Sequence, residues 1–143
     1  MFIKDIFYSY QGEGPFVGYP QLFIRFYGCN IHCSYCDEPD FSKDKRKYSI
    51  DDVLSEIEPY KNAPLHSISI TGGEPLLYAK YFTELIPKLP APAYLETNAT
   101  LPDKLREFKF NKIAIVVDYN LYKSNKIVKN FIQKISNDFK CVV

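Results

Sequence analysis

Apolar positions along this 143-residue chain change repeatedly between a strand pattern and a helical pattern. Short runs of strand-forming residues bounded by turn residues predict strands, and apolar residues three and four positions apart predict helices. The expected strands cover residues 21–27, 66–71, 94–97, 112–118 and 139–143, with a further strand within 1–10. The expected helices cover 50–57, 76–85, 102–108 and 125–137.

Two segments carry the clearest signals. Ser49 suits an N-cap, with Asp52 three residues on, and Pro59 ends the helix that follows. Residues 113–117 are all apolar, which is typical of a strand buried on both faces of a parallel sheet. Strands that alternate with helices predict an α/β fold with a parallel sheet.

Four clusters of polar residues and glycines directly follow or close the predicted strands, at 28–37, 72–75, 96–98 and 118–120. The carboxyl ends of parallel strands share one edge of the sheet, where α/β proteins build their sites. We therefore expect these four clusters to form one site.

Three cysteines in one short run, Cys29, Cys33 and Cys36, have the spacing Cys-x3-Cys-x2-Cys. Because cysteine thiolates hold iron–sulfur clusters, these thiols can bind three irons of a 4Fe–4S cluster and leave the fourth iron open. A zinc site is the main alternative, with His32 as a fourth ligand, although the tight loop would strain that tetrahedron. Buried or paired cysteines are the third interpretation, and a disulfide needs an oxidising compartment.

Composition narrows the class of protein without indicating a partner. The length favours one domain over residues 1–143. The net charge of +1 gives no hint of nucleic acid or membrane, and no apolar stretch is long enough to span a bilayer. The basic run at 43–47 fits a solvated loop better than a phosphate patch. Residues 1–5 lack the features of a signal peptide, so we expect a cytoplasmic protein.

The loop Gly72-Gly73-Glu74-Pro75 has chemistry of its own. Two glycines let the backbone approach a ligand closely, and Pro75 starts the next helix well. A carboxylate beside exposed carbonyl groups suits an ammonium group. Alone the loop fits a plain turn equally well, but on the strand after the cysteine run it indicates a shared site.

The cysteine run and the Gly72–Pro75 loop together resemble the radical S-adenosylmethionine superfamily. The resemblance implies a 4Fe–4S cluster on Cys29, Cys33 and Cys36, with S-adenosylmethionine bound through its amino and carboxylate groups at the open iron. Its cleavage yields a 5′-deoxyadenosyl radical, which needs a closed, water-poor pocket. The implied fold is a partial, incomplete parallel-stranded βα barrel that is shorter than usual.

Residues 8–25, 71–77 and 96–98 are also similar to the 7-carboxy-7-deazaguanine synthase family. That family converts 6-carboxy-5,6,7,8-tetrahydropterin to 7-carboxy-7-deazaguanine with loss of ammonia, a lyase reaction toward the tRNA nucleosides queuosine and archaeosine. The implied S-adenosylmethionine contacts are Tyr35, Cys36, Asp37, Gly73, Glu74, Glu96, Asn98 and Asp118. The implied substrate contacts are Tyr10, Gln11, Gly12, Glu13, Arg25 and Thr71.

Some of these contacts also have a physical reason. Arg25 lies in a strand among apolar neighbours, where a guanidinium can bind a carboxylate through two parallel hydrogen bonds. A surface ion pair is the alternative. The turn at 11–14 offers backbone groups to a pterin edge, although a plain glycine turn is the alternative. Glu96 and Asn98 could instead serve the structure of a strand end.

The chain departs from that family in three places. Glu38 stands where a Thr commonly helps to bind Mg²⁺, and a carboxylate is itself a good ligand for that ion. Asn120 stands where a Lys is frequent, two residues after Asp118. The chain is also short for the family, so we expect either a C-terminally truncated domain or an unusually open barrel.

Two other functions share part of these features. A radical S-adenosylmethionine activase of a glycyl radical enzyme has the same cysteine spacing and Gly-Gly-Glu-Pro loop, but it would not need Arg25 or the 11–14 turn. A non-catalytic metal-binding module is the alternative from another class. The main interpretation implies a small pterin substrate, an external one-electron donor of the flavodoxin or ferredoxin type and a homodimer, with no nucleic acid or membrane as partner.

Overall fold

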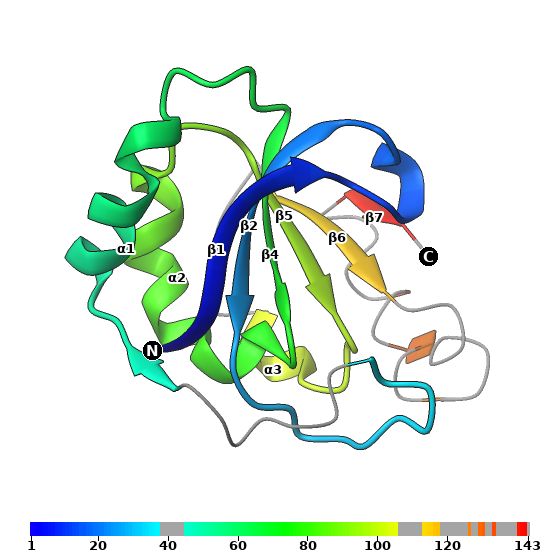
Figure 1. Ribbon diagram of the computed structural model, residues 1–143. Coiled ribbons are helices and arrows are strands. Elements are labelled where there is room, and N and C mark those ends of the chain that lie inside the picture. The colour runs from blue at the N-terminus through cyan, green and yellow to red at the C-terminus, as the bar shows by residue number, and fades with distance from the viewer. Residues whose placement is uncertain are drawn as a thin grey trace.

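The computed structural model describes residues 1–37, 45–105, 113–117, 126, 129, 130, 133 and 140–142 (Figure 1). A single seven-stranded sheet runs through it, in the order β3-β1-β2-β4-β5-β6-β7. The strands are β1 (Phe2–Tyr10), β2 (Pro20–Phe26), β3 (Arg46–Lys47), β4 (Ser67–Gly72), β5 (Ala93–Thr97), β6 (Ile113–Val117) and β7 (Lys140–Val142). Every strand predicted from the sequence is thus confirmed.

Neighbouring strands pair in parallel along the order β2-β4-β5-β6-β7, and β1 pairs antiparallel with both β2 and β3. β2, β4 and β5 therefore end at the same edge of the sheet, which Figure 1 shows at the bottom. The loop after β2 runs along that edge. This arrangement confirms the partial parallel α/β fold expected from the sequence.

The helices are α1 (Ile50–Ile57), α2 (Ala79–Leu85) and α3 (Pro102–Leu105), with 3-10 turns at Gly14–Phe16, Glu58–Tyr60, Pro75–Tyr78 and Ile86–Lys88. The predicted cap of α1 is present as a capping box. The Ser49 hydroxyl accepts a hydrogen bond from the backbone N–H of Asp52 at 3.1 Å, and the Asp52 carboxylate accepts one from the backbone N–H of Ser49 at 2.8 Å. Two backbone donors at the start of the helix are satisfied in this way.

The expected helix at 76–85 has a different start, because its first turn is a 3-10 turn and the α-helix begins only at Ala79. The Glu74 side chain accepts the backbone N–H of Leu76 and so tightens that turn. The expected helix at 102–108 is described as far as Leu105. Of the expected helix at 125–137, residues 126, 129, 130 and 133 are helical, and the rest lies outside the described residues, as do Glu38, Asp118 and Asn120.

The two faces of the sheet differ in chemistry. Ile68 and Ile70 of β4 are fully buried in an apolar core that also contains Val53 of α1 and Phe82 of α2. Because side chains alternate along a strand, Ser67, Ser69 and Thr71 lie on the opposite face. The helices thus cover an apolar face, and polar side chains line the other. Within the part of the chain that is described, no helix is long and apolar enough to cross a bilayer.

Candidate functional site

Glu96 of β5 is the centre of the polar face of the sheet. Its Oε1 accepts hydrogen bonds from Gln11 Nε2 at 2.9 Å and from Ser69 Oγ at 2.7 Å. Its Oε2 accepts one from Thr71 Oγ1 at 2.8 Å. From the sequence, Glu96 could be a ligand contact or a structural residue at a strand end. The structure shows a half-buried carboxylate whose two oxygens accept hydrogen bonds from three uncharged donors, so its position is fixed.

Gln11 joins the N-terminal segment to this network. Its Nε2 also donates to Gln21 Oε1 at 3.0 Å, and Gln21 Nε2 donates to Ser67 Oγ at 2.7 Å. The backbone N–H and carbonyl of Gln11 bond to Tyr19 and Gly18. The expectation of exposed backbone groups at Gln11 is therefore not met, because the protein itself uses them. Gly12 and Glu13, by contrast, are exposed.

Arg25 lies near the carboxyl end of β2, in register with Thr71 of β4. It is half-buried, and its guanidinium carbon lies 5.1 Å from the centre of the Phe7 ring on β1. Since side chains alternate along β2, Arg25 shares the polar face with Gln21. The structure therefore places a cation and the Thr71 hydroxyl at the same end of the polar face. Tyr10, at the end of β1, is 65% exposed.

The glycine loop after β4 presses against the end of β2. Gly72 has φ +113°, and a Cβ there would lie 2.3 Å from the carbonyl oxygen of Phe26. The backbone N–H of Gly73 donates to Phe26 at 3.0 Å, and that of Glu74 donates to the Gly28 carbonyl at 2.8 Å. Because those N–H groups are engaged, Gly73 can offer a ligand its carbonyl oxygen, which suits an ammonium group rather than an anion.

Glu74 is fully buried, and its carboxylate is enclosed by protein donors. Oε1 accepts from Leu76 N and Thr97 Oγ1, both at 2.8 Å, and Oε2 accepts from Asn98 N at 2.8 Å. Burial raises the pKa of the Glu74 carboxyl above its ordinary value, and these hydrogen bonds oppose the rise. The carboxylate therefore ties the loop after β4 to the end of β5. The cofactor contact expected at Glu74 stays a prediction, because its carboxylate oxygens and its backbone N–H and carbonyl all bond to the protein here.

The three predicted cluster cysteines lie on the loop after β2, and none forms a disulfide. Cys29 and Cys33 are half-buried and Cys36 is exposed, and the backbone N–H of Cys36 bonds to the Cys33 carbonyl at 3.2 Å. Burial raises the pKa of the Cys29 thiol, while hydrogen bonds from backbone N–H groups and from Asn98 oppose this. Among the described residues, no three His, Cys, Asp or Glu side chains are grouped to hold a single metal ion.

Asn98 connects the end of β5 to the cysteine loop. Its Nδ2 lies 3.7 Å from Cys29 Sγ and 3.0 Å from Asn30 Oδ1. The cysteine loop, the glycine loop and the end of β5 thus meet through Asn98 and Glu74. Tyr35 and Asp37 are exposed on the same loop as the cysteines, and their predicted roles remain predictions.

Four residues that hold the site side chains in place were not expected from the sequence: Gln21, Ser67, Ser69 and Thr100. Thr97 was expected only as a member of the 96–98 cluster, and no role was assigned to it. One signal was available for the serines. Residues 67–71 alternate polar and apolar, whereas a parallel strand buried on both faces would be apolar throughout. That alternation indicates a strand with one polar face. Thr97 carries no comparable signal, because its partner Glu74 is 23 positions away. Thr100 bonds both to the nearby Asn98 and to the distant Asn30, and only the first contact is local in sequence.

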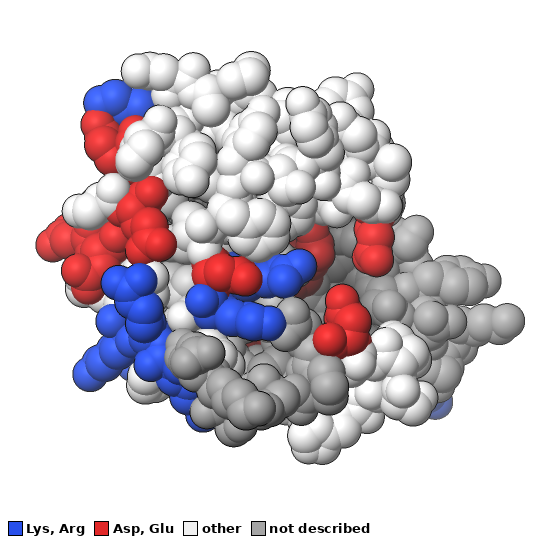
Figure 2. Space-filling view, viewed as in Figure 1, with Lys and Arg blue, Asp and Glu red and all other residues white. Residues whose placement is uncertain are grey.

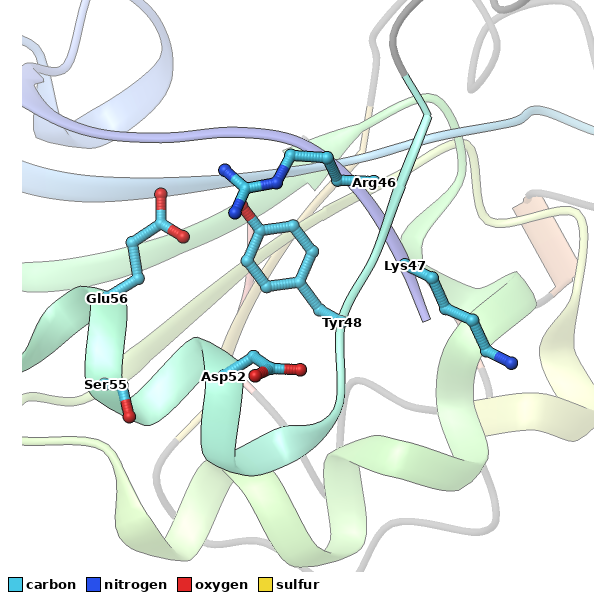
Figure 3. A pocket seen from close by; sticks show the side chains of 6 residues that line it. All are labelled: Arg46, Lys47, Tyr48, Asp52, Ser55 and Glu56. Carbon is cyan, nitrogen blue, oxygen red and sulfur yellow. The ribbon is translucent and has the colours of Figure 1, made fainter.

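A separate surface cavity of about 410 Å³ lies between β3 and α1, on the far side of β1 from β2. Arg46, Tyr48, Asp52 and Glu56 are among its lining residues, and Figure 3 shows the Arg46 guanidinium over the Tyr48 ring, 5.1 Å from its centre. Figure 2 shows acidic atoms gathered over α1 and basic atoms beside them near β3. The opposite charges lie side by side, so this cavity has no net preference for an anion or a cation.

Comparisons with known proteins find curated relatives that share one name. The 7-carboxy-7-deazaguanine synthase of Methanothermobacter thermautotrophicus is 45% identical over 120 residues, which are 82% of this chain and 46% of that protein. The 7-carboxy-7-deazaguanine synthase of Archaeoglobus fulgidus is 41% identical over 116 residues, which cover 74% of this chain and 49% of that protein. The chain spans about half the length of the curated relatives it matches.

A solved structure shows the same fold. The crystal structure of QueE from Escherichia coli superposes with a TM-score of 0.54 at 18% identity, and covers 99% of this chain and 92% of that one. A model of the Radical SAM superfamily matches residues 23–138, which include Cys29, Cys33, Cys36 and the glycine loop. Because this match covers more than half of its length, the chain belongs to the radical SAM superfamily.

Proposed function

We propose that this chain is a single radical S-adenosylmethionine domain that makes 7-carboxy-7-deazaguanine from 6-carboxy-5,6,7,8-tetrahydropterin with loss of ammonia. The observation that carries the proposal is the meeting of the cysteine loop, the glycine loop and the Glu96 network at one edge of the sheet. The names and identities of the relatives support this choice of reaction.

The residues present fit a 4Fe–4S cluster. Cys29, Cys33 and Cys36 are three free thiols on one short loop, and thiolates are the usual ligands of such clusters. When bound, the cluster and S-adenosylmethionine supply the carbon radical that abstracts hydrogen from the substrate. The chain's own task is to hold both and to exclude water. The Gly73 carbonyl would accept from the cofactor's ammonium group.

The polar face of the sheet fits a small carboxylated pterin. Arg25 would bind the substrate carboxylate, with Thr71 beside it in register. Glu96 would accept hydrogen bonds from the N–H groups of the pterin edge, since Gln11, Ser69 and Thr71 hold its oxygens in place. The exposed Tyr10, Gly12 and Glu13 lie at and after the end of β1, beside the start of β2, and would contact the substrate from that side. Tight enclosure of this kind protects a carbon radical from side reactions.

Further components belong to the same proposal. Mg²⁺ would assist substrate binding with Glu38 as a ligand, and Asp118 would contact S-adenosylmethionine. Tyr35 and Asp37 would contact the same cofactor. A flavodoxin- or ferredoxin-type protein would donate the electron, in the cytoplasm, to a homodimer that needs neither nucleic acid nor membrane.

Anaerobic reconstitution with iron and sulfide, followed by S-adenosylmethionine, a reductant and the tetrahydropterin, tests the proposal. We expect 5′-deoxyadenosine and the deazaguanine product. Arg25→Gln should weaken substrate binding by roughly tenfold to a hundredfold, because a charge-assisted pair is lost. Its reductive cleavage of S-adenosylmethionine without substrate should be unchanged. Formation of 5′-deoxyadenosine without the deazaguanine product would refute the substrate assignment.

A further inference from the structure

Asn98 is the one residue whose side chain links the end of β5 directly to a cluster cysteine among the described residues. It is 8% exposed. Its Nδ2 has two hydrogens, and two acceptors lie within reach: Cys29 Sγ at 3.7 Å and Asn30 Oδ1 at 3.0 Å. A distance of 3.7 Å is ordinary for an N–H group that donates to sulfur.

The orientation of the Asn98 amide is fixed by its other end. Oδ1 accepts from the backbone N–H of Thr100 at 3.0 Å and from the Thr100 hydroxyl at 2.7 Å. A backbone N–H can only donate, so a flipped amide would place one donor against another. The NH2 group must therefore face Cys29 and Asn30.

The backbone of Asn98 is held just as firmly. Its N–H donates to the buried carboxylate of Glu74 at 2.8 Å. The next residue, Ala99, has φ +55°, a left-handed conformation that a residue with a Cβ seldom adopts, and its N–H donates to Thr97 Oγ1. The loop is thus pinned on both sides of Asn98. The Asn98 Nδ2 donor is therefore held at a fixed position beside Cys29 Sγ.

The geometry points to Asn98 as a positioning residue that raises the reduction potential of the cluster through its hydrogen bond to Cys29. This inference rests on the proposed function, because it requires that Cys29 bind iron. Hydrogen bonds to the ligating sulfurs are among the factors that set the potentials of iron–sulfur clusters. A donor stabilises the reduced cluster more than the oxidised one, since the reduced form carries more negative charge. The site is half-buried at Cys29, which strengthens the effect.

A redox titration of the anaerobically reconstituted full chain, followed by the EPR signal of the reduced cluster, tests this inference. Two variants remove the donor. Asn98→Ala deletes the amide, and Asn98→Asp keeps the acceptor for Thr100 but turns an oxygen toward Cys29. At the potential where the wild-type cluster is half reduced, we expect the ratio of reduced to oxidised cluster to fall about tenfold in either variant, which is about 59 mV for one electron.

Asn30→Ala is the matched control, because it removes the second acceptor of the Asn98 NH2 group, and the Asn30 bond to the Thr100 hydroxyl, but leaves the bond to Cys29. Its ratio should stay within about twofold of the wild type. A wild-type potential in Asn98→Asp with four irons bound would overturn the inference, and so would an equal shift in Asn30→Ala. Failure of the wild type to take up iron and sulfide would instead overturn the proposed function, and this inference with it.

Discussion

Replacing Glu74 by Gln removes one acceptor from the buried connection between the loop after β4 and the end of β5. The wild-type carboxylate accepts the backbone N–H of Leu76 on one oxygen and that of Asn98 on the other. Glutamine has a single acceptor oxygen. Either way it turns, one of the two backbone donors loses its partner and meets an NH2 group, with no solvent to replace the bond because Glu74 is fully buried.

A buried donor left without an acceptor costs about 1–3 kcal/mol of stability. Glutamine also avoids burying a charge, which offsets a part of it, so we expect the free energy of unfolding to fall by about 2 kcal/mol at pH 5. For a domain of this length that loss lowers Tm by about 6 °C. The deficit should shrink as the pH rises to 8. Because burial raises the pKa of Glu74, the folded chain keeps the proton longer than the unfolded chain, and the wild type loses stability above the unfolded value of 4.5.

Urea unfolding of the reduced protein under anaerobic conditions, followed by far-UV circular dichroism at both pH values, measures these differences. Glu84→Gln is the matched control, because Glu84 is an exposed residue of α2 whose partner is Lys88. Its stability should change by less than about 0.5 kcal/mol. If the Glu74→Gln protein were as stable as the wild type, the Glu74 carboxylate would not stabilise the connection between the loop after β4 and the end of β5. A deficit that grows with pH would refute the raised pKa.

Two further substitutions test the local structure. Gly72→Ala should lower the free energy of unfolding by about 3 kcal/mol or more, because the new Cβ would lie 2.3 Å from the Phe26 carbonyl oxygen at φ +113°. Gly12→Ala is the control: nothing lies within 4 Å of a Cβ there, so the free energy of unfolding should change by less than about 0.5 kcal/mol. Equal effects of the two substitutions in urea unfolding would refute the close approach at Gly72. Ser49→Ala should cost about 1 kcal/mol in the same assay, because the cap of α1 is lost, and Ser49→Asp should restore most of it; an Ala variant with wild-type stability would show that the cap contributes nothing.

The sequence was sufficient to predict every strand except β3, which lies in the basic run expected to be a loop, and to predict the edge that the parallel strands share. Residues 113–117 are apolar throughout and form β6, paired in parallel on both sides. The start of α1 was also predictable, because a capping box lies within four residues and needs no tertiary contact. Local patterns of this kind do not depend on the rest of the fold.

The roles of individual site residues were less predictable, since they depend on contacts between distant segments. The sequence suggested that Glu74 contacts a ligand, yet the structure buries its carboxylate against residues 97 and 98, which are more than twenty positions away. The sequence suggested that Gln11 belongs to an exposed turn, yet its side-chain amide donates a hydrogen bond to Glu96 on β5. A charged or amide side chain beside a glycine turn looks the same in sequence whether it faces a ligand or the protein.

We propose that Cys29, Cys33 and Cys36 hold a 4Fe–4S cluster with one iron open to S-adenosylmethionine. Iron and acid-labile sulfide analysis after anaerobic reconstitution, with EPR of the reduced protein before and after S-adenosylmethionine is added, tests it most directly. We predict about four irons per chain and an EPR spectrum that changes when S-adenosylmethionine binds. One zinc per chain without sulfide, or a cluster whose spectrum ignores S-adenosylmethionine, would contradict the account.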